Sequence, residues 1–133
     1  MKVFLDTNVL VSAFATRGLS ADLLELVLIE HDLITGRNVL KELERVLRSK
    51  IKLPAARCAE IVDFVALEAT TVVEKAIAAD CAADEDDRTI LGEAIAGAAE
   101  AFVTGDAAVA ALGEVGGMRI LTPRQLWEAL RSP

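Results

Sequence analysis

The feature that most constrains the fold is an alternation of short β-prone runs with longer segments of helical periodicity. Runs rich in Val, Ile, Leu and Phe predict five strands, over residues 2–6, 32–35, 70–73, 101–104 and 118–121. Between and after them, apolar residues recur every three to four positions, which predicts helices over 20–30, from 38, from 54, after 84–87 and from 123. Strands that alternate with helices form a parallel sheet, so the chain is expected to be an α/β protein.

No linker, internal repeat or low-complexity run divides the chain, and we therefore expect a single domain over residues 1–133. Three local features are also predicted. Asp6-Thr7-Asn8 is a turn-type sequence after the first strand, Ser20 is a suitable helix cap, and Leu67 is assigned to the inward face of its helix.

Composition excludes several classes of protein. Although 53% of the residues are hydrophobic, no apolar run approaches the ~18–20 residues that span a bilayer. The apolar run after Met1-Lys2 ends at Asp6, too early for a signal peptide. Cys58 and Cys81 do not form a CxxC pair, which argues against a disulfide scaffold or a zinc site. We expect a cytoplasmic protein that does not contact a membrane.

The net charge of −7 counts against a protein that holds duplex nucleic acid by bulk charge. It does not exclude an enzyme that handles nucleic acid through a metal, because acids gathered at such a site would add to the negative total.

Acidic residues stand where a parallel sheet gathers its loops. Asp6 and Asp106 follow β-prone runs, and the carboxyl ends of parallel strands are where ligands bind in such folds. Glu42 borders the apolar stripe of its predicted helix. Asp87, four residues before Leu91, belongs on the inward-turning side of the helix that follows the acidic run 84–87.

Each of these acids also has an ordinary structural explanation. Asp6 is suited to a turn or a helix cap, Glu42 to a salt bridge at the core border, and the acidic run to compensation of a helix dipole. Four adjacent acids repel one another, however, and dipole compensation needs only one or two of them.

Convergent carboxylates raise one another's pKa unless a cation neutralises them, and all-oxygen ligands suit Mg²⁺ or Mn²⁺. His31 is the single histidine, so no Ser-His or Cys-His arrangement is available. A receiver-like, Mg²⁺-binding signalling domain also gathers acids at strand ends. It fits poorly, because its third strand should end in Asp and its fifth in Lys, whereas these end in Val73-Glu74 and Leu121-Thr122.

Four segments, in this order along nearly the whole chain, resemble the PIN domain: VFLDTNVLVSAF, VLKELERVL, ADEDDRTILGEAIAGAAEAFVTGD and RILTPRQLWEAL. The resemblance is strongest to small prokaryotic toxins of toxin–antitoxin pairs, the VapC-like proteins. It implies an α/β/α sandwich around a central, mostly parallel five-stranded sheet. It also implies a Mg²⁺- or Mn²⁺-dependent endoribonuclease acting on single-stranded RNA, usually homodimeric and often inhibited by a small antitoxin. A housekeeping PIN nuclease without an antitoxin is the alternative.

By the same resemblance, the catalytic and metal-binding acids are Asp6, Glu42, Asp87 and Asp106. The resemblance also implies two polar residues beside these acids, Asn8 and Thr104. Asp84 and Asp86 match additional acids of the VapC-like subgroup, and the resemblance leaves open whether either one contacts the metal.

Basic residues for an RNA backbone are concentrated between residues 41 and 52. Lys41, Arg45 and Arg48 recur at helical spacing on one face, which suits either an RNA-contacting strip or an ordinary solvated surface. The mean hydropathy of +0.42 further suggests that the apolar faces near 23–28 and 61–65 are covered in a homodimer.

Overall fold

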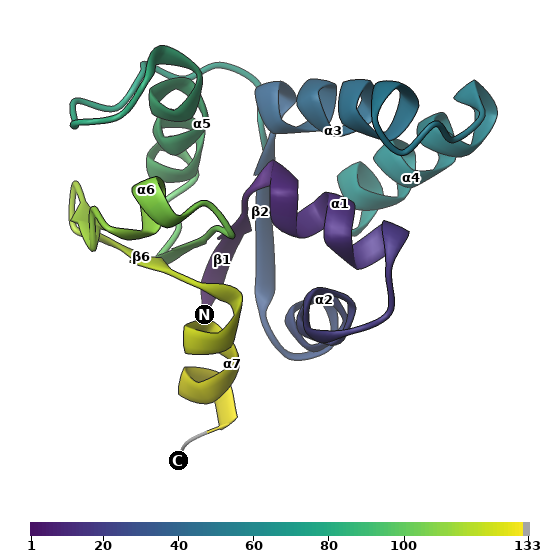
Figure 1. The fold of residues 1–133 in the computed structure, drawn as a ribbon. Helices are drawn as coiled ribbons and strands as arrows, with labels where there is room; N and C mark the ends of the chain where they lie inside the picture. The colour runs from purple at the N-terminus through teal and green to yellow at the C-terminus, as the bar shows by residue number, and fades with distance from the viewer. Residues whose placement is uncertain (132–133) are drawn as a thin grey trace.

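A computed structural model describes residues 1–131 and shows a six-stranded sheet with helices on both faces (Figure 1). The strands are β1 (Lys2–Leu5), β2 (Asp32–Gly36), β3 (Thr71–Val73), β4 (Ala101–Val103), β5 (Glu114–Val115) and β6 (Met118–Leu121). The helices are α1 (Thr7–Ala15), α2 (Leu19–Glu30), α3 (Arg37–Ser49), α4 (Ala55–Glu68), α5 (Glu85–Ala96), α6 (Ala107–Ala110) and α7 (Pro123–Arg131). The predicted α/β fold with a central, mostly parallel sheet is confirmed.

The strand order is β3-β2-β1-β4-β6-β5, and every neighbouring pair is parallel except β5 and β6. The five parallel strands are the five that the sequence predicts. The additional strand, β5, has only two residues, too few to show any periodicity. It is joined to β6 by Gly116 and Gly117, which both adopt positive φ (55° and 84°), the conformation that a tight hairpin turn requires.

The core lies on both sides of the central strands. Helices α1 to α4 are drawn on one side of β1 and β2 in Figure 1, and α5 lies on the other. Val3, Phe4 and Leu5 of β1 are almost completely buried, and the rings of Phe4 and Phe102 stack with centroids 5.4 Å apart. A strand covered on both faces is uniformly apolar, which is why the run before Asp6 shows no alternation.

Three local predictions are wrong. The sequence after β1 is not a turn, because α1 begins at Thr7 with Asp6 as its N-cap. Ser20 does not cap α2; it lies inside the helix, and Gly18 occupies the N-cap without a side-chain hydrogen bond. Leu67 is 83% exposed, because it lies six residues, or about 240° of helix rotation, from the inward Ile61.

Most of the apolar residues suggested for a homodimer are occupied within the chain. Leu23, Val27, Ile61 and Val65 are buried in the core, whereas Phe64 is 42% exposed. Within residues 1–131, no helix is long and apolar enough to cross a membrane.

The N-terminus of α3 is capped by a residue from another helix. Glu93 of α5 is fully buried, and its carboxylate accepts hydrogen bonds from the backbone N–H of Asn38 (2.8 Å), the Asn38 side chain (3.2 Å) and the backbone N–H of Val39 (3.2 Å). Gly36 is required beside it, because a Cβ atom there would overlap the Glu93 carboxylate. This contact fixes α3 against α5 and so fixes the direction in which α3 presents its side chains.

Candidate active site

The topology creates a crevice beyond the carboxyl ends of β1 and β4. From β1 the chain continues to β2 on one side, whereas from β4 it continues to β6 on the other, so the strand order reverses between β1 and β4. Open α/β sheets bind ligands at such a switch point. Asp6 directly follows β1, and Thr104 and Asp106 follow β4.

Asp6 is held rigidly at this point. Its Oδ1 accepts a hydrogen bond from the backbone N–H of Thr7 (2.8 Å), and its Oδ2 accepts from the Thr104 hydroxyl (2.8 Å) and the Asn8 amide (3.2 Å). Asn8 in turn accepts from the backbone N–H of Gly105 through its Oδ1 (2.7 Å). The segments after β1 and β4 are therefore tied together through the carboxylate.

Three of the acids also begin helices. Asp6 caps α1. Asp84 caps α5 by accepting from the backbone N–H of Asp87 (2.8 Å). Asp106 caps α6, accepting from the N–H groups of Ala108 (2.8 Å) and Val109 (3.2 Å) through Oδ1. Capping is thus a real role of these residues, but for Asp106 it uses one carboxylate oxygen and leaves Oδ2 without a partner in the described chain.

One groove of about 500 Å³ brings the four predicted catalytic acids together. Asp6 follows β1, Glu42 lies on α3, Asp87 on α5, and Asp106 follows β4. The groove also contains apolar and polar residues of α1 and α3, with the segment that follows α3: Thr7, Asn8, Val11, Ser12, Ala15, Thr16, Arg45, Val46, Lys50 and Ile51. Four separate elements therefore contribute one carboxylate each to the same concave surface.

The electrostatics of the groove are those of an uncompensated acidic cluster. Burial raises the pKa of Asp6, an effect that its hydrogen bonds oppose and the nearby charge of Glu42 adds to. Burial and the charges of Asp84, Asp6 and Asp106 raise the pKa of Asp87 to about 6. Within residues 1–131, none of the four groove acids forms an ion pair with Lys or Arg.

The donor set fits a hard divalent cation in its chemistry. Carboxylate oxygens are the ligands that Mg²⁺ and Mn²⁺ prefer, and a cation would relieve the repulsion that raises the pKa of Asp87. In the part of the chain that the structure describes, however, no three His, Cys, Asp or Glu side chains are placed as a ready-made metal site. Side-chain rotation would therefore have to bring the carboxylates closer together around an ion.

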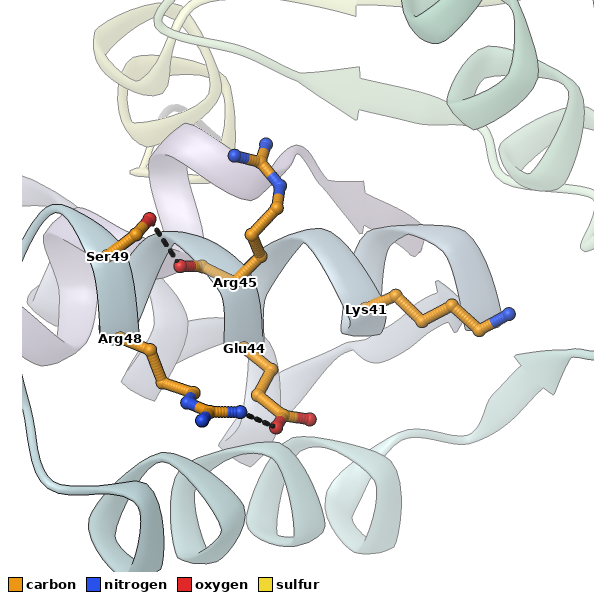
Figure 2. A pocket seen from close by; sticks show the side chains of 5 residues that line it. All are labelled: Lys41, Glu44, Arg45, Arg48 and Ser49. Atoms are coloured by element: carbon orange, nitrogen blue, oxygen red, sulfur yellow. Dashed lines mark hydrogen bonds and ion pairs between the residues drawn. The ribbon is translucent and has the colours of Figure 1, made fainter.

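The remaining predicted residues fall into two groups. Asn8 and Thr104 contact Asp6 directly, as described above. Asp84 lines an adjoining pocket with Asp87 and Asp106, whereas Asp86 is exposed on the first turn of α5 and does not line the groove. Lys41, Arg45 and Arg48 line a surface hollow on α3 (Figure 2), and of these three only Arg45 also lines the groove.

Sequence reasoning missed most of the residues that line the groove beside the four acids, Thr7 and Lys50 among them, and it missed the buried cap. Thr7 is buried, and its hydroxyl has no hydrogen-bond partner in residues 1–131. Lys50 is the C-cap of α3 and enters the groove although it is outside the helical face used for the prediction. Glu93 gave no signal at all, because its partners are more than 50 residues away in the sequence.

The fold and the acidic groove define an α/β protein with a carboxylate-lined site at the switch point of its sheet, and comparison with known proteins identifies the family. Residues 2–108 match the PIN domain family, so the chain belongs to that family. PIN domains are nucleases and generally use divalent metal ions. The resemblance on which the site residues were predicted is thereby confirmed at the level of the family.

A solved structure shares the fold. It is the crystal structure of VapBC2 from Rickettsia felis bound to a DNA fragment from the VapBC2 promoter. The match has a TM-score of 0.64 and 18% sequence identity, and it covers 92% of this chain and 98% of the chain in that structure. No curated protein matches this chain. Membership of the PIN family also removes the basis for the receiver-like alternative.

Proposed function

We propose that this PIN-domain nuclease is a Mg²⁺- or Mn²⁺-dependent endoribonuclease that hydrolyses phosphodiester bonds of single-stranded RNA, and that residues 1–133 form one domain. The observation that carries the proposal is the groove at the switch point of the sheet. It is lined by Asp6, Glu42, Asp87 and Asp106, and none of these four is ion-paired within residues 1–131.

In this proposal, the residues of the groove have different roles. The hydrogen bonds from Thr7, Thr104 and Asn8 fix Asp6, so that one rigid carboxylate defines the position of the site. Asp106 is oriented by its capping bonds and presents Oδ2. Glu42 and Asp87 both line the groove, and neither forms an ion pair with Lys or Arg in residues 1–131. They are therefore the candidates to take a proton from the attacking water. Asp6, Asp87 and Asp106, with Glu42, would hold the cation, which supplies Lewis acidity that activates water and neutralises charge on the leaving oxygen.

The same proposal extends to a toxin with a small antitoxin partner and a homodimeric state. The antitoxin partner draws support from the shared fold with VapBC2 and from an open acidic groove that would accept a basic segment of a partner. The homodimeric state follows from the family resemblance alone. Growth arrest on expression, relieved by co-expression of a short neighbouring reading frame, is the expected result. A housekeeping nuclease would arrest nothing and have no such neighbour. Light scattering at twice the chain mass tests the dimer.

The first experiment measures cleavage of labelled single-stranded RNA with Mg²⁺, Mn²⁺ or EDTA. We expect cleavage only with metal, its loss in Asp6→Asn, and its retention in Asp86→Asn, which removes the same charge from an exposed acid outside the groove. A folded protein that binds Mn²⁺ and cleaves no RNA would contradict the assigned substrate. A protein that binds no metal, or one in which Asp86→Asn is as damaging as Asp6→Asn, would contradict the assigned site.

A further inference from the structure

Arg45 lies on the boundary between two concave surfaces. It lines the acidic groove, and it also lines a hollow of about 560 Å³ formed by side chains of α3 alone. The hollow contains three cations and one acid, together with a serine: Lys41, Arg45, Arg48, Glu44 and Ser49. A positively charged surface therefore begins where the carboxylate groove ends.

The two arginines of this surface differ in their contacts. Nη1 of Arg48 lies 3.5 Å from Oε1 of Glu44, one turn away on the same helix, so its charge is already partly compensated. Arg45 forms no ion pair within residues 1–131. In Figure 2 its guanidinium extends away from Arg48 and Glu44, which point together in the opposite direction.

The groove is electrostatically asymmetric about its acids. On the α3 side, two exposed cations line it, Arg45 and Lys50. Beyond Asp87 and Asp106 on the α5 and α6 side, the adjoining pocket contributes Asp84 and small apolar residues: Ala82, Ala83, Ala108 and Val109. A polyanionic strand crossing the acids thus finds cations on one side only.

We propose that Arg45 is a phosphate-binding, positioning residue that holds the backbone phosphate next to the scissile one and directs the substrate strand along α3. This inference rests on the proposed function. A guanidinium binds phosphate through two parallel N–H donors, which fixes direction as well as distance. Lys50 adds a second charge on the same wall. Arg48 contributes little because it does not line the groove and extends away from Arg45, toward Glu44.

The test measures binding of a short, fluorescently labelled single-stranded RNA by anisotropy in Mg²⁺, in an Asp87→Asn background that does not cleave. Arg45→Gln is compared with Arg48→Gln, which removes the same charge one turn away from the same helix. We expect Arg45→Gln to weaken binding about 10-fold and to reduce the slope of log K against log salt by about 0.7, the value for one phosphate contact on a single strand. Arg48→Gln should change binding less than about 2-fold.

Two further measurements separate positioning from simple charge. Arg45→Lys keeps the charge without the planar donor pair, so it should recover part of the lost affinity. Replacing RNA phosphates one at a time with uncharged methylphosphonates should reveal one position that matters to the parent protein but not to Arg45→Gln. In the cleavage-competent chain, Arg45→Gln should raise KM more than it lowers kcat.

Equal effects of Arg45→Gln and Arg48→Gln would overturn the inference, because they would show a diffuse charge effect. So would full-strength binding by Arg45→Gln. In either case metal-dependent cleavage that Asp6→Asn abolishes would leave the proposed function standing. If the parent chain neither bound nor cleaved RNA, the role of Arg45 and the proposed function would both be overturned. Circular dichroism melts of these exposed-site variants should match the parent and so exclude misfolding.

Discussion

Asp6 and Glu93 are both buried carboxylates, and burial raises the pKa of both, yet their surroundings differ. Glu93 is enclosed: its oxygens receive hydrogen bonds from Asn38 and Val39, and Gly36 leaves only enough room for the carboxylate. Asp6 is equally well hydrogen-bonded, but it lines an open groove and adds to the charges that raise the pKa of Asp87.

Under the proposed function, the difference distinguishes a structural acid, Glu93, from a functional one, Asp6. Satisfied hydrogen bonds do not distinguish them, because both acids have them. The two acids differ in their access to solvent and in the presence of neighbouring carboxylates without ion-pair partners. Glu93 has an ordinary structural task, whereas the arrangement around Asp6 remains electrostatically incomplete without a cation.

The largest expected effect is on catalysis. Asp6→Asn keeps the size of the side chain and removes its charge, so RNA cleavage should fall at least about 1,000-fold, equivalent to about 4 kcal/mol of activation free energy. The free energy of unfolding should fall by only about 1 kcal/mol, because the amide NH2 of Asn cannot accept the hydrogen bonds that one carboxylate oxygen receives. Steady-state kinetics and calorimetry of the same samples make the comparison, and a large loss of stability would assign Asp6 the same role as Glu93.

The second largest expected effect is on stability, when the structural acid Glu93 is removed. Glu93→Ala leaves the N–H groups of Asn38 and Val39 without their buried acceptor, so the free energy of unfolding should drop by about 3 kcal/mol. Urea unfolding measures this, with the exposed Glu85→Ala on the same helix as the control. Because the same contact orients α3, which carries Glu42, activity per folded molecule should fall only a few-fold. A loss as large as that of Asp6→Asn in the folded fraction would contradict a structural role.

Gly36→Ala tests the close contact between residue 36 and the Glu93 carboxylate by changing residue 36 instead of Glu93. The added methyl would meet the Glu93 carboxylate, and we expect it to cost about 2 kcal/mol of stability. Combining it with Glu93→Ala should restore part of the loss, since the obstructing carboxylate is then gone. Strict additivity in the double variant would show that the two residues do not interact.

Thr104→Val removes the hydroxyl that donates to Asp6 and accepts from the backbone N–H of Asp106. We expect a loss of about 1–2 kcal/mol in stability. Cleavage should also become slower, because Asp6 and Asp106 lose their common anchor. Thermal melts and initial rates test the two effects. Thr104→Ser, which keeps the hydroxyl, should retain most of both, and a Ser variant as impaired as Val would point to lost packing instead.

The smallest expected effect is a gain in folding stability on replacing Asp87 by Asn. Because the pKa of Asp87 is raised from 3.8 to about 6, the stability associated with its protonated form is fully present below pH 3.8 and lost as the pH rises through 6. Without metal, Asp87→Asn should therefore be more stable than the parent by about 1 kcal/mol at pH 8, a small figure because the side chain is partly exposed.

Denaturation at pH 4 and pH 8 checks the direction. The advantage of Asp87→Asn should shrink toward pH 4, where the parent is largely protonated, and should reverse at pH 8 when Mn²⁺ binds the parent more tightly. A pH-independent difference between the two proteins would mean that repulsion among the groove acids is not its cause.

The sequence predicted those parts of the fold and site that depend on local patterns. The five parallel strands are short apolar, β-prone runs and α3 has clear helical periodicity. The four acids were recognisable because each follows a strand or stands near an apolar face. The helices α1 and α6 were missed because each begins directly after a strand-end Asp, which looks like a turn. Helix capping and a site at the end of a strand use the same residue type, so sequence alone could not separate them.

Other features depend on contacts between distant segments. Nothing near Glu93 indicates that it caps α3, and nothing near Lys50 indicates that it enters the groove. Most of the apolar surface assigned to a dimer is buried in the core, because helices α2 and α4 each pack Leu and Val or Ile side chains against the rest of the chain, while Ile29, Phe64 and Leu67 stay exposed. Periodicity identifies a face that must be covered, but only the tertiary structure shows what covers it.

The hydrogen bond between Asp6 and Thr104 joins residues 98 positions apart, and β1 pairs with β4 over the same span. A chain that stops before the segment after β4 has neither this bond nor Asp106. Under the proposed function, the site is therefore assembled only after β4 has been synthesised and has paired with β1. An incomplete copy still attached to the ribosome would then cleave no RNA.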